Sequence, residues 1–237
     1  LAKLGLKDGE SIAHPWVSKA LERAQGKVES RNFDLRKNIL KYDDVVNVQR
    51  KEIFSQRRNI METTDVSEMF ENIYMDVVED IIIENIPEGS FVDQWDIDGL
   101  EIALKDQFNL TVEISEFVKK DGILETEIRD IILKEVQNNL EHKKYEVGET
   151  TFKILQKQIL LQVVDHCWSS HLSTLDHLRS VIGFRGYAQR DPLNEYKQEA
   201  FILFENLLEK IKKETIKVVF FAKFISDTDI ETDRVQQ

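Results

Sequence analysis

The sequence predicts an all-α protein with one very long helix, an inserted block of shorter helices and a long antiparallel two-helix hairpin. Only 9 Gly and 3 Pro occur in 237 residues, and both residue types break helices. Apolar residues recur at helical spacing through most of the chain. The charge shifts abruptly, from a net +5 over residues 14–61 to a net −16 over residues 62–148. This shift indicates one module boundary near residue 62 and another near residue 148.

Residues 16–61 predict a single continuous helix, because the segment has no proline and only Gly26. Pro15 suits its first turn, and the helix would be roughly 70 Å long. A helix of this length either dimerises as a coiled coil or serves as a spine on which other parts dock. Its apolar stripe drifts between rows spaced by seven, and Gln49 and Gln56 interrupt one row. The drift and the interruption favour docking.

The acidic block predicts a small helical domain. Asp65 and Glu68 have the spacing of a capping box, which would start a helix that runs to about Ile86. Residues 109–114 are compatible with one short strand, although a lone strand has nothing to pair with. Gly148 would close the last helix of the block. Further helices are expected over residues 97–108, 113–119 and 124–146.

Residues 150–182 and 192–222 predict the hairpin, since each carries a wide apolar face. Asp191 and Pro192 form a helix start, with Asp at the N-cap and Pro in the first turn. The tail from residue 223 to residue 237 is polar.

The loop at residues 183–191 is the strongest candidate site in the sequence. Its glycines permit backbone conformations that other residues resist. An exposed Tyr187 would offer a flat apolar face with a polar tip, which can contact many peptide sequences without selecting one. The alternative is a tyrosine that folds back onto the core of the hairpin, and the residues alone leave both open. The candidate contact residues are Arg185, Gly186, Tyr187 and Arg190.

Several classes of site are disfavoured by the sequence. It has no phosphate-binding glycine loop, no nucleophile elbow and no H-E-x-x-H motif. The single cysteine, Cys167, excludes an internal disulfide and is expected to be an inert core residue. No apolar run is long enough to cross a bilayer, and the acidity argues against nucleic acid as a partner. His166, His171 and His177 are five and six residues apart, so we interpret them as polar surface or margin positions rather than metal ligands.

The long helix also carries a series of basic residues, which are either a patch for an anionic surface or a solvated helix face that pairs with acids such as Asp34 and Glu52. We favour the solvated face, because exposure is the default state of charged residues. The basic residues are Arg36, Lys37, Lys41, Arg50, Lys51, Arg57 and Arg58.

Four segments of the sequence resemble the SecA family, the motor ATPases of the bacterial Sec preprotein translocase. The similarity extends in order from about residue 1 to residue 222. The segments are HPWVSKALERAQGKVE (14–29), ESRNFDLRKNILKYDDVVNVQR (29–50), WDIDGL (95–100) and WSSHLSTLDHLRSVIGFRGYAQRDPLNEYKQEAF (168–201).

This resemblance implies a domain organisation. Residues 1–13 would end the second nucleotide-binding domain, 14–62 would be the long helix of the helical scaffold domain, and 63–148 the helical wing domain. Residues 149–222 would form the two-helix finger of the scaffold domain, followed by the polar tail. Tyr187 matches the fingertip tyrosine of the family, which contacts translocating polypeptide at the mouth of the SecY channel.

The resemblance further implies partners, cofactors and location. ATP and Mg would belong to nucleotide-binding domains of a larger polypeptide, so we expect this chain to bind no cofactor and to be inactive alone. The expected partners are preprotein, the SecYEG channel and an anionic membrane surface, with a homodimer also possible. The expected location is the cytoplasm and the inner face of the bacterial plasma membrane. The alternatives are a helical adaptor that dimerises through a coiled coil, testable by sedimentation, and a helical-bundle metalloprotein.

Overall fold

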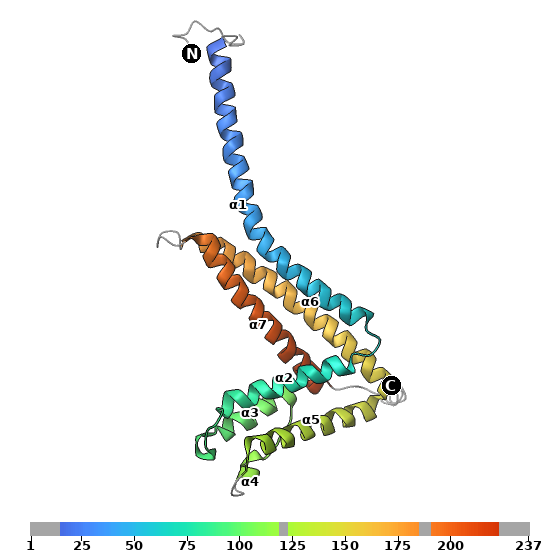
Figure 1. The fold of residues 1–237 in the computed structure, drawn as a ribbon. Coiled ribbons are helices and arrows are strands. Elements are labelled where there is room, and N and C mark those ends of the chain that lie inside the picture. Colours follow the sequence, from blue (N-terminus) through green and yellow to red (C-terminus); the bar gives the residue numbers. More distant parts are fainter. Residues whose placement is uncertain (1–14, 119–122, 185–190, 223–237) are drawn as a thin grey trace, which may run out of the picture.

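The computed structural model describes residues 15–118, 123–184 and 191–222. Within these residues every regular element is helical, which confirms the predicted all-α class (Figure 1). The short 3₁₀ helix η2 (Val92–Gln94) lies between the second and third α-helices. The α-helices are α1 (Pro15–Glu62), α2 (Ser67–Asn85), α3 (Ile97–Phe108), α4 (Ile114–Val118), α5 (Glu125–Val147), α6 (Glu149–Ile182) and α7 (Pro192–Phe221).

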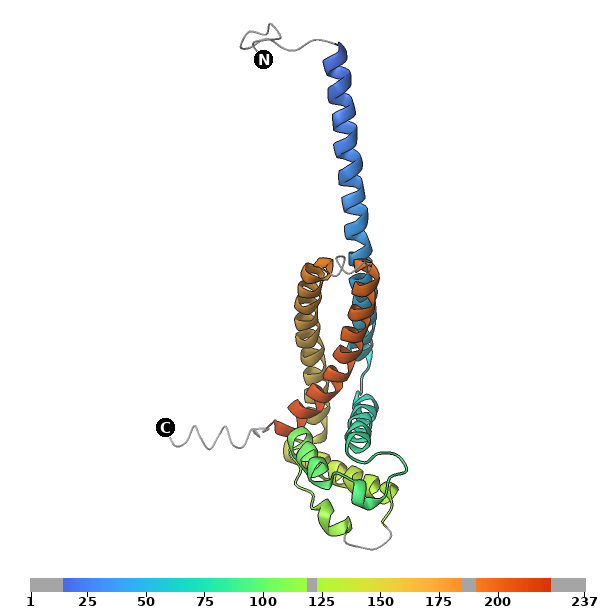
Figure 2. The same cartoon turned by 90° about the vertical axis from the view of Figure 1, so that its left-hand side faces the viewer.

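Helix α1 is continuous over 48 residues and has two halves with different surroundings. Residues 16–41 are all exposed, and this half extends away from the rest of the molecule (Figures 1 and 2). From Tyr42 onwards the helix lies against α6 and α7, and Gln49, Ile53 and Ile60 become buried. The docking interpretation therefore holds for the second half of the helix.

Helices α6 and α7 run antiparallel and form the predicted hairpin (Figure 1). Asp191 caps α7 as expected, since its Oδ1 accepts a hydrogen bond from the Leu193 backbone N–H at 3.0 Å, and Pro192 occupies the first turn. One apolar cluster joins the hairpin to the second half of α1. Its buried members are Ile53, Ile60, Val66, Leu160, Val163, Val164, Cys167, Trp168, Leu207 and Ile211.

Residues 63–148 fold into α2 to α5, below the hairpin in the view of Figure 1. Arg129 of α5 ties this block together through ion pairs with Glu79 of α2 at 2.8 Å and Glu125 at 3.1 Å. The apolar core of the block is not made by the block alone. It also contains four buried residues of the hairpin, namely Phe152, Ile216, Val219 and Phe220.

Two short connections attach the block to the long helices. At the end of α1, the Lys157 ammonium donates hydrogen bonds to the backbone carbonyls of Met61 and Thr63, both at 2.8 Å. The cation lies at the negative end of the helix dipole of α1, where it is stabilising. On the other side, Gly148 alone separates α5 from α6, with φ +84° and ψ 145°. Few residues other than glycine adopt this backbone conformation.

Two local expectations are corrected by the structure. Helix α2 begins at Ser67 and its N-cap residue, Val66, makes no side-chain cap, so the predicted capping box is not formed. Asp65 instead accepts a hydrogen bond from the Ser67 N–H at 2.9 Å and pairs with Lys153 at 2.9 Å. Residues 109–113 are not a strand, although Leu110 and Val112 are buried in alternation. The structure offers this extended segment no partner strand among residues 15–118, 123–184 and 191–222.

In the part of the chain that the structure describes, no helix is both long and apolar enough to span a bilayer.

Candidate functional site: the hairpin and its junction with the long helix

Residues 185–190 of the predicted contact loop lie outside the described residues. On either side of them the structure describes Phe184, which is 71% exposed, and Asp191, the cap of α7. The structure thus leaves both readings of the loop tyrosine as predictions. The residues concerned are Arg185, Gly186, Tyr187 and Arg190.

The described ends of the hairpin nearest that loop pack on the middle of α1. Tyr42 of α1 makes an edge contact with the ring of Tyr196 on α7, with centroids 5.0 Å apart and an interplanar angle of 64°. The Arg179 guanidinium of α6 lies 5.5 Å from the centre of the Tyr42 ring and pairs with Asp43 at 2.8 Å. Aromatic and cation–π contacts of this kind are directional. They therefore hold α1 to both helices of the hairpin.

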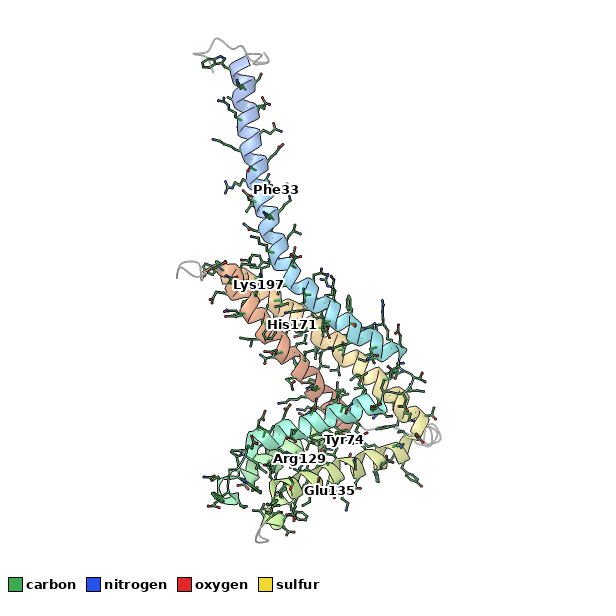
Figure 3. The ribbon with its side chains drawn as sticks, viewed as in Figure 1. Phe33, Tyr74, Arg129, Glu135, His171 and Lys197 are labelled. Carbon is green, nitrogen blue, oxygen red and sulfur yellow. The ribbon has the colours of Figure 1, made fainter. Side chains whose placement is uncertain are left out.

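Two turns further along α1, Gln49 makes a buried polar contact with both hairpin helices. Its Nε2 donates to the Ala200 carbonyl of α7 at 2.8 Å, and its Oε1 lies 2.9 Å from Nε2 of His171 on α6. His171 is 6% exposed, and burial lowers the pKa of its imidazole. Figure 3 shows His171 at this junction. The interpretation of His171 as a surface or margin residue was therefore wrong.

The lower part of the junction is an ion pair. The Arg57 guanidinium binds Asp165 of α6 through two parallel bonds, Nε to Oδ1 at 2.7 Å and Nη2 to Oδ2 at 3.1 Å. Both side chains are partly solvated, so the pair adds little to stability, although its bidentate geometry fixes orientation. Arg57 thus pairs with another helix rather than with an acid on its own. The remaining residues of the basic series are exposed, in accord with a solvated face.

Two grooves flank the junction. Between α1 and α7 lies a mainly apolar groove of about 590 Å³, lined by Val45, Val48, Phe201 and Phe204 and edged by charged residues that include Lys197 (Figure 3). Between α1 and α6 lies a polar groove of about 550 Å³, whose charged lining residues are Asp43, Asp44, Arg50, Asp176 and Arg179. The docked half of α1 therefore presents an apolar groove towards α7 and a charged one towards α6.

The remaining sequence candidates do not assemble into a reactive centre. Among the described residues, no group of three or more His, Cys, Asp or Glu side chains is placed to hold a metal ion. His166 and His177 are exposed on α6. Cys167 is a buried core residue as expected, and burial raises the pKa of its thiol. A neutral thiol in an apolar core is unreactive.

The site residues that the sequence did not reveal are Gln49 and His171. Gln49 interrupts an apolar row, as Gln56 does seven residues later, and its partner His171 lies 122 residues away. A polar residue that breaks an apolar row is a signal for a buried hydrogen bond. The signal gives no indication of which residue is the partner.

The fold and the junction define an all-α scaffold protein. It is built on one long helix, with a docked hairpin and an inserted helical block. The family model that describes the SecA wing and scaffold domain matches residues 11–223. The chain is also 49% identical, over 213 residues, to the protein translocase subunit SecA of Bartonella tribocorum (strain CIP 105476 / IBS 506). The chain belongs to the SecA family. The match covers 90% of this chain and 24% of that relative, so the chain spans about a quarter of the relative's length.

Proposed function

We propose that this chain is the wing and scaffold part of a translocase that moves preproteins through the SecYEG channel with the energy of ATP. The proposal rests on the family and on the long helix, of which one half is held by the hairpin while the other is exposed. Nucleotide-binding domains on the exposed half of α1 would generate motion, and the docked half would pass it to α6 and α7. Residues 1–13 would belong to the second of those domains.

ATP and Mg have their proposed place in the nucleotide-binding domains of the larger polypeptide. The residues of this chain do not fit a nucleotide site, because the sequence has no phosphate-binding glycine loop. No step of the proposed mechanism therefore passes through a nucleotide bound here. The contribution of this chain is mechanical: it holds a fixed geometry between a long helix and a hairpin.

Preprotein contact is proposed for the loop, through Tyr187 with Arg185, Gly186 and Arg190. The observation that carries this proposal is that long helices support the loop on both sides. Two helices of 34 and 30 residues enter and leave the loop, and near that end α6 forms an ion pair with α1 and α7 makes an aromatic contact with it. An aromatic residue on such a support would press on polypeptide without reading its sequence.

The proposed location is the cytoplasm and the inner face of the plasma membrane, where the channel is. The exposed half of α1 carries Lys19, Arg23, Lys27 and further basic residues, with exposed apolar side chains between them. Phe33, 59% exposed, is one of these apolar residues (Figure 3). An anionic membrane surface or a second copy of the subunit are proposed contacts of this half.

The test is Tyr187→Ala in the full translocase subunit, with preprotein transport into vesicles measured in vitro. We expect transport to fall severalfold while basal ATP hydrolysis is retained, because the change removes the contact and not the motor. Tyr145→Ala is the matched control, since Tyr145 of α5 is 89% exposed and lies in the block of residues 63–148. Equal transport by both variants would refute the fingertip role.

A further inference from the structure

The buried amide at the junction of α1, α6 and α7 differs from the contacts around it. In the described part of the chain, only Gln49, Gln156, His171 and Thr215 are both polar and buried. Two of these four bond each other across helices that are far apart in sequence. Gln49 is thus a side chain of α1 that hydrogen-bonds to both helices of the hairpin.

The direction of both hydrogen bonds follows from the groups involved. The Ala200 carbonyl can only accept, so the amide nitrogen of Gln49 donates to it. The amide oxygen of Gln49 can only accept, so Nε2 of His171 carries a proton and donates. Both bonds are formed only when the amide occupies one position and one orientation.

The partners of Gln49 are themselves packed. The His171 ring contacts Trp168, with centroids 5.6 Å apart, and Phe204, at 6.0 Å. Ala200 has no exposed surface. A displaced α1 would leave the buried Nε2–H of His171 and the buried amide of Gln49 without these partners, which is unfavourable.

The apolar contacts do not distinguish one register of α1 on the hairpin from another in the same way. Ile53 and Ile60 of α1 are spaced by seven, and a helix that shifts along such a row exchanges one apolar contact for another. Hydrophobic burial is non-directional. Gln56 does not help either, because its amide bonds Glu52 of the same helix at 3.0 Å. Of these two glutamines, Gln49 alone bonds the hairpin.

We infer that Gln49 is a positioning residue, which fixes the register and rotation of α1 on the hairpin through His171 and Ala200. The link to transport rests on the proposed function. If α1 passes motion to the hairpin, a change of register at this point would reduce the motion that reaches α6 and α7. A single polar residue in an apolar helix interface sets register in the same way in coiled coils.

The register is measured by the distance between spin labels on Val48 of α1 and Ile202 of α7, which are 68% and 55% exposed. The buried Cys167 is replaced by alanine in every sample. Gln49→Met keeps the side-chain length and removes both bonds. We expect it to add a second distance, with the shifted population rising by about tenfold or more. Gln56→Met is the matched control, with one distance as in the unsubstituted chain.

A single, unchanged distance in Gln49→Met would overturn the inference. Should that variant fold poorly, Gln49→Glu decides the question through NMR titration of His171. A carboxylate in place of the amide, at 2.9 Å from the imidazole nitrogen, should raise the pKa of His171. An unchanged His171 pKa would show that the two side chains do not meet, and would equally overturn the inference.

The same substitutions in the full translocase subunit separate this inference from the proposed function. We expect Gln49→Met to lower the amount of preprotein moved per ATP hydrolysed, and Gln56→Met to leave it unchanged. A second register together with undiminished transport would support the positioning role of Gln49 and refute the proposed coupling. One register in Gln49→Met refutes the positioning role whatever transport does.

Discussion

At the scale of single residues, Asp80 of α2 shows how the block of residues 63–148 and the hairpin meet through charge. Burial raises the pKa of its carboxyl, and Glu209 of α7 raises it further by repulsion and by a hydrogen bond. Lys212 and Lys213 lower it in part. The folded-state pKa is thus above the unfolded one, so the penalty for ionised Asp80 is complete at pH values above the raised pKa. The penalty disappears as the pH falls to the unfolded pKa.

Asp80→Asn is therefore expected to stabilise the chain at pH 7, by less than about 1 kcal/mol because the site is partly solvated. An amide also donates a hydrogen bond to Glu209. The gain should shrink as the pH falls through the raised pKa and vanish below about pH 4. Urea denaturation at pH 7 and pH 4 measures it.

Asp76→Asn is the control, because Asp76 lies one turn before Asp80 and pairs with Lys212 at 3.1 Å. Its removal should leave stability unchanged or lower at pH 7, the opposite sign to Asp80→Asn. Equal effects of the two substitutions would contradict the explanation for Asp80.

Single residues are also where sequence and structure diverge most. The cap at Asp191 was predictable, since it bonds a backbone group two residues away. The contacts of Gln49 and Arg57 were not, because their partners lie 122 and 108 residues away on another helix. A residue pattern records apolarity and local spacing. It contains no measure of which polar groups a fold brings together.

At the scale of elements, two glycines with different backbone conformations test the helix assignments. Gly148 has φ +84° between α5 and α6, whereas Gly26 lies within the exposed half of α1. A Cβ would meet nothing within 4 Å at either position. The effects of alanine at the two sites therefore reflect backbone conformation rather than crowding.

Gly148→Ala should destabilise the chain by about 1–3 kcal/mol, because alanine resists this conformation. Gly26→Ala should strengthen α1, by roughly 0.5–1 kcal/mol in helix propensity. Thermal unfolding reports on the first, and far-UV circular dichroism of the exposed half of α1 on the second. A neutral Gly148→Ala would mean that α5 and α6 are joined differently.

The elements themselves were largely predictable from the sequence. Periodic apolar stripes and breakers gave α1, α5, α6 and α7 to within two residues at each end. The ambiguous segment was 109–114, where Leu110, Val112 and Ile114 are buried in alternation as in a strand. Alternating apolar residues show only that one side of an extended segment is buried. A strand also needs a neighbouring strand to which its backbone can hydrogen-bond. The domain names attached to these segments stay predictions.

At the scale of the whole molecule, the block of residues 63–148 and the hairpin share one apolar core. Ile216, Val219 and Phe220 of α7 are buried among residues of α2, α3 and α5. Phe220 meets Phe108 of α3 edge to face, with centroids 5.0 Å apart. The Lys143 ammonium of α5 also donates to the Ala222 carbonyl at 3.0 Å. The end of α7 is thus part of the interior of the block.

Phe220→Ala should therefore loosen the block and the end of α7 together, at a cost of about 3–5 kcal/mol. Hydrogen exchange is the measurement: amides of α2 and α3 should lose protection along with those of α7. Phe221→Ala is the neighbouring control, because Phe221 is 45% exposed, and it should cost far less. Loss of protection in α7 alone would show that the block is stable without it.

Lys157 and Lys153 of α6 contact Met61, Thr63 and Asp65, so the end of α1 lies close to the start of α6. The two ends of the segment 67–147 are therefore near each other in space. Such a segment is removable in principle by a short splice between two adjacent helix ends. Its excision would expose Phe152, Ile216, Val219 and Phe220, so a shortened chain would remain soluble only if those four positions were made polar at the same time.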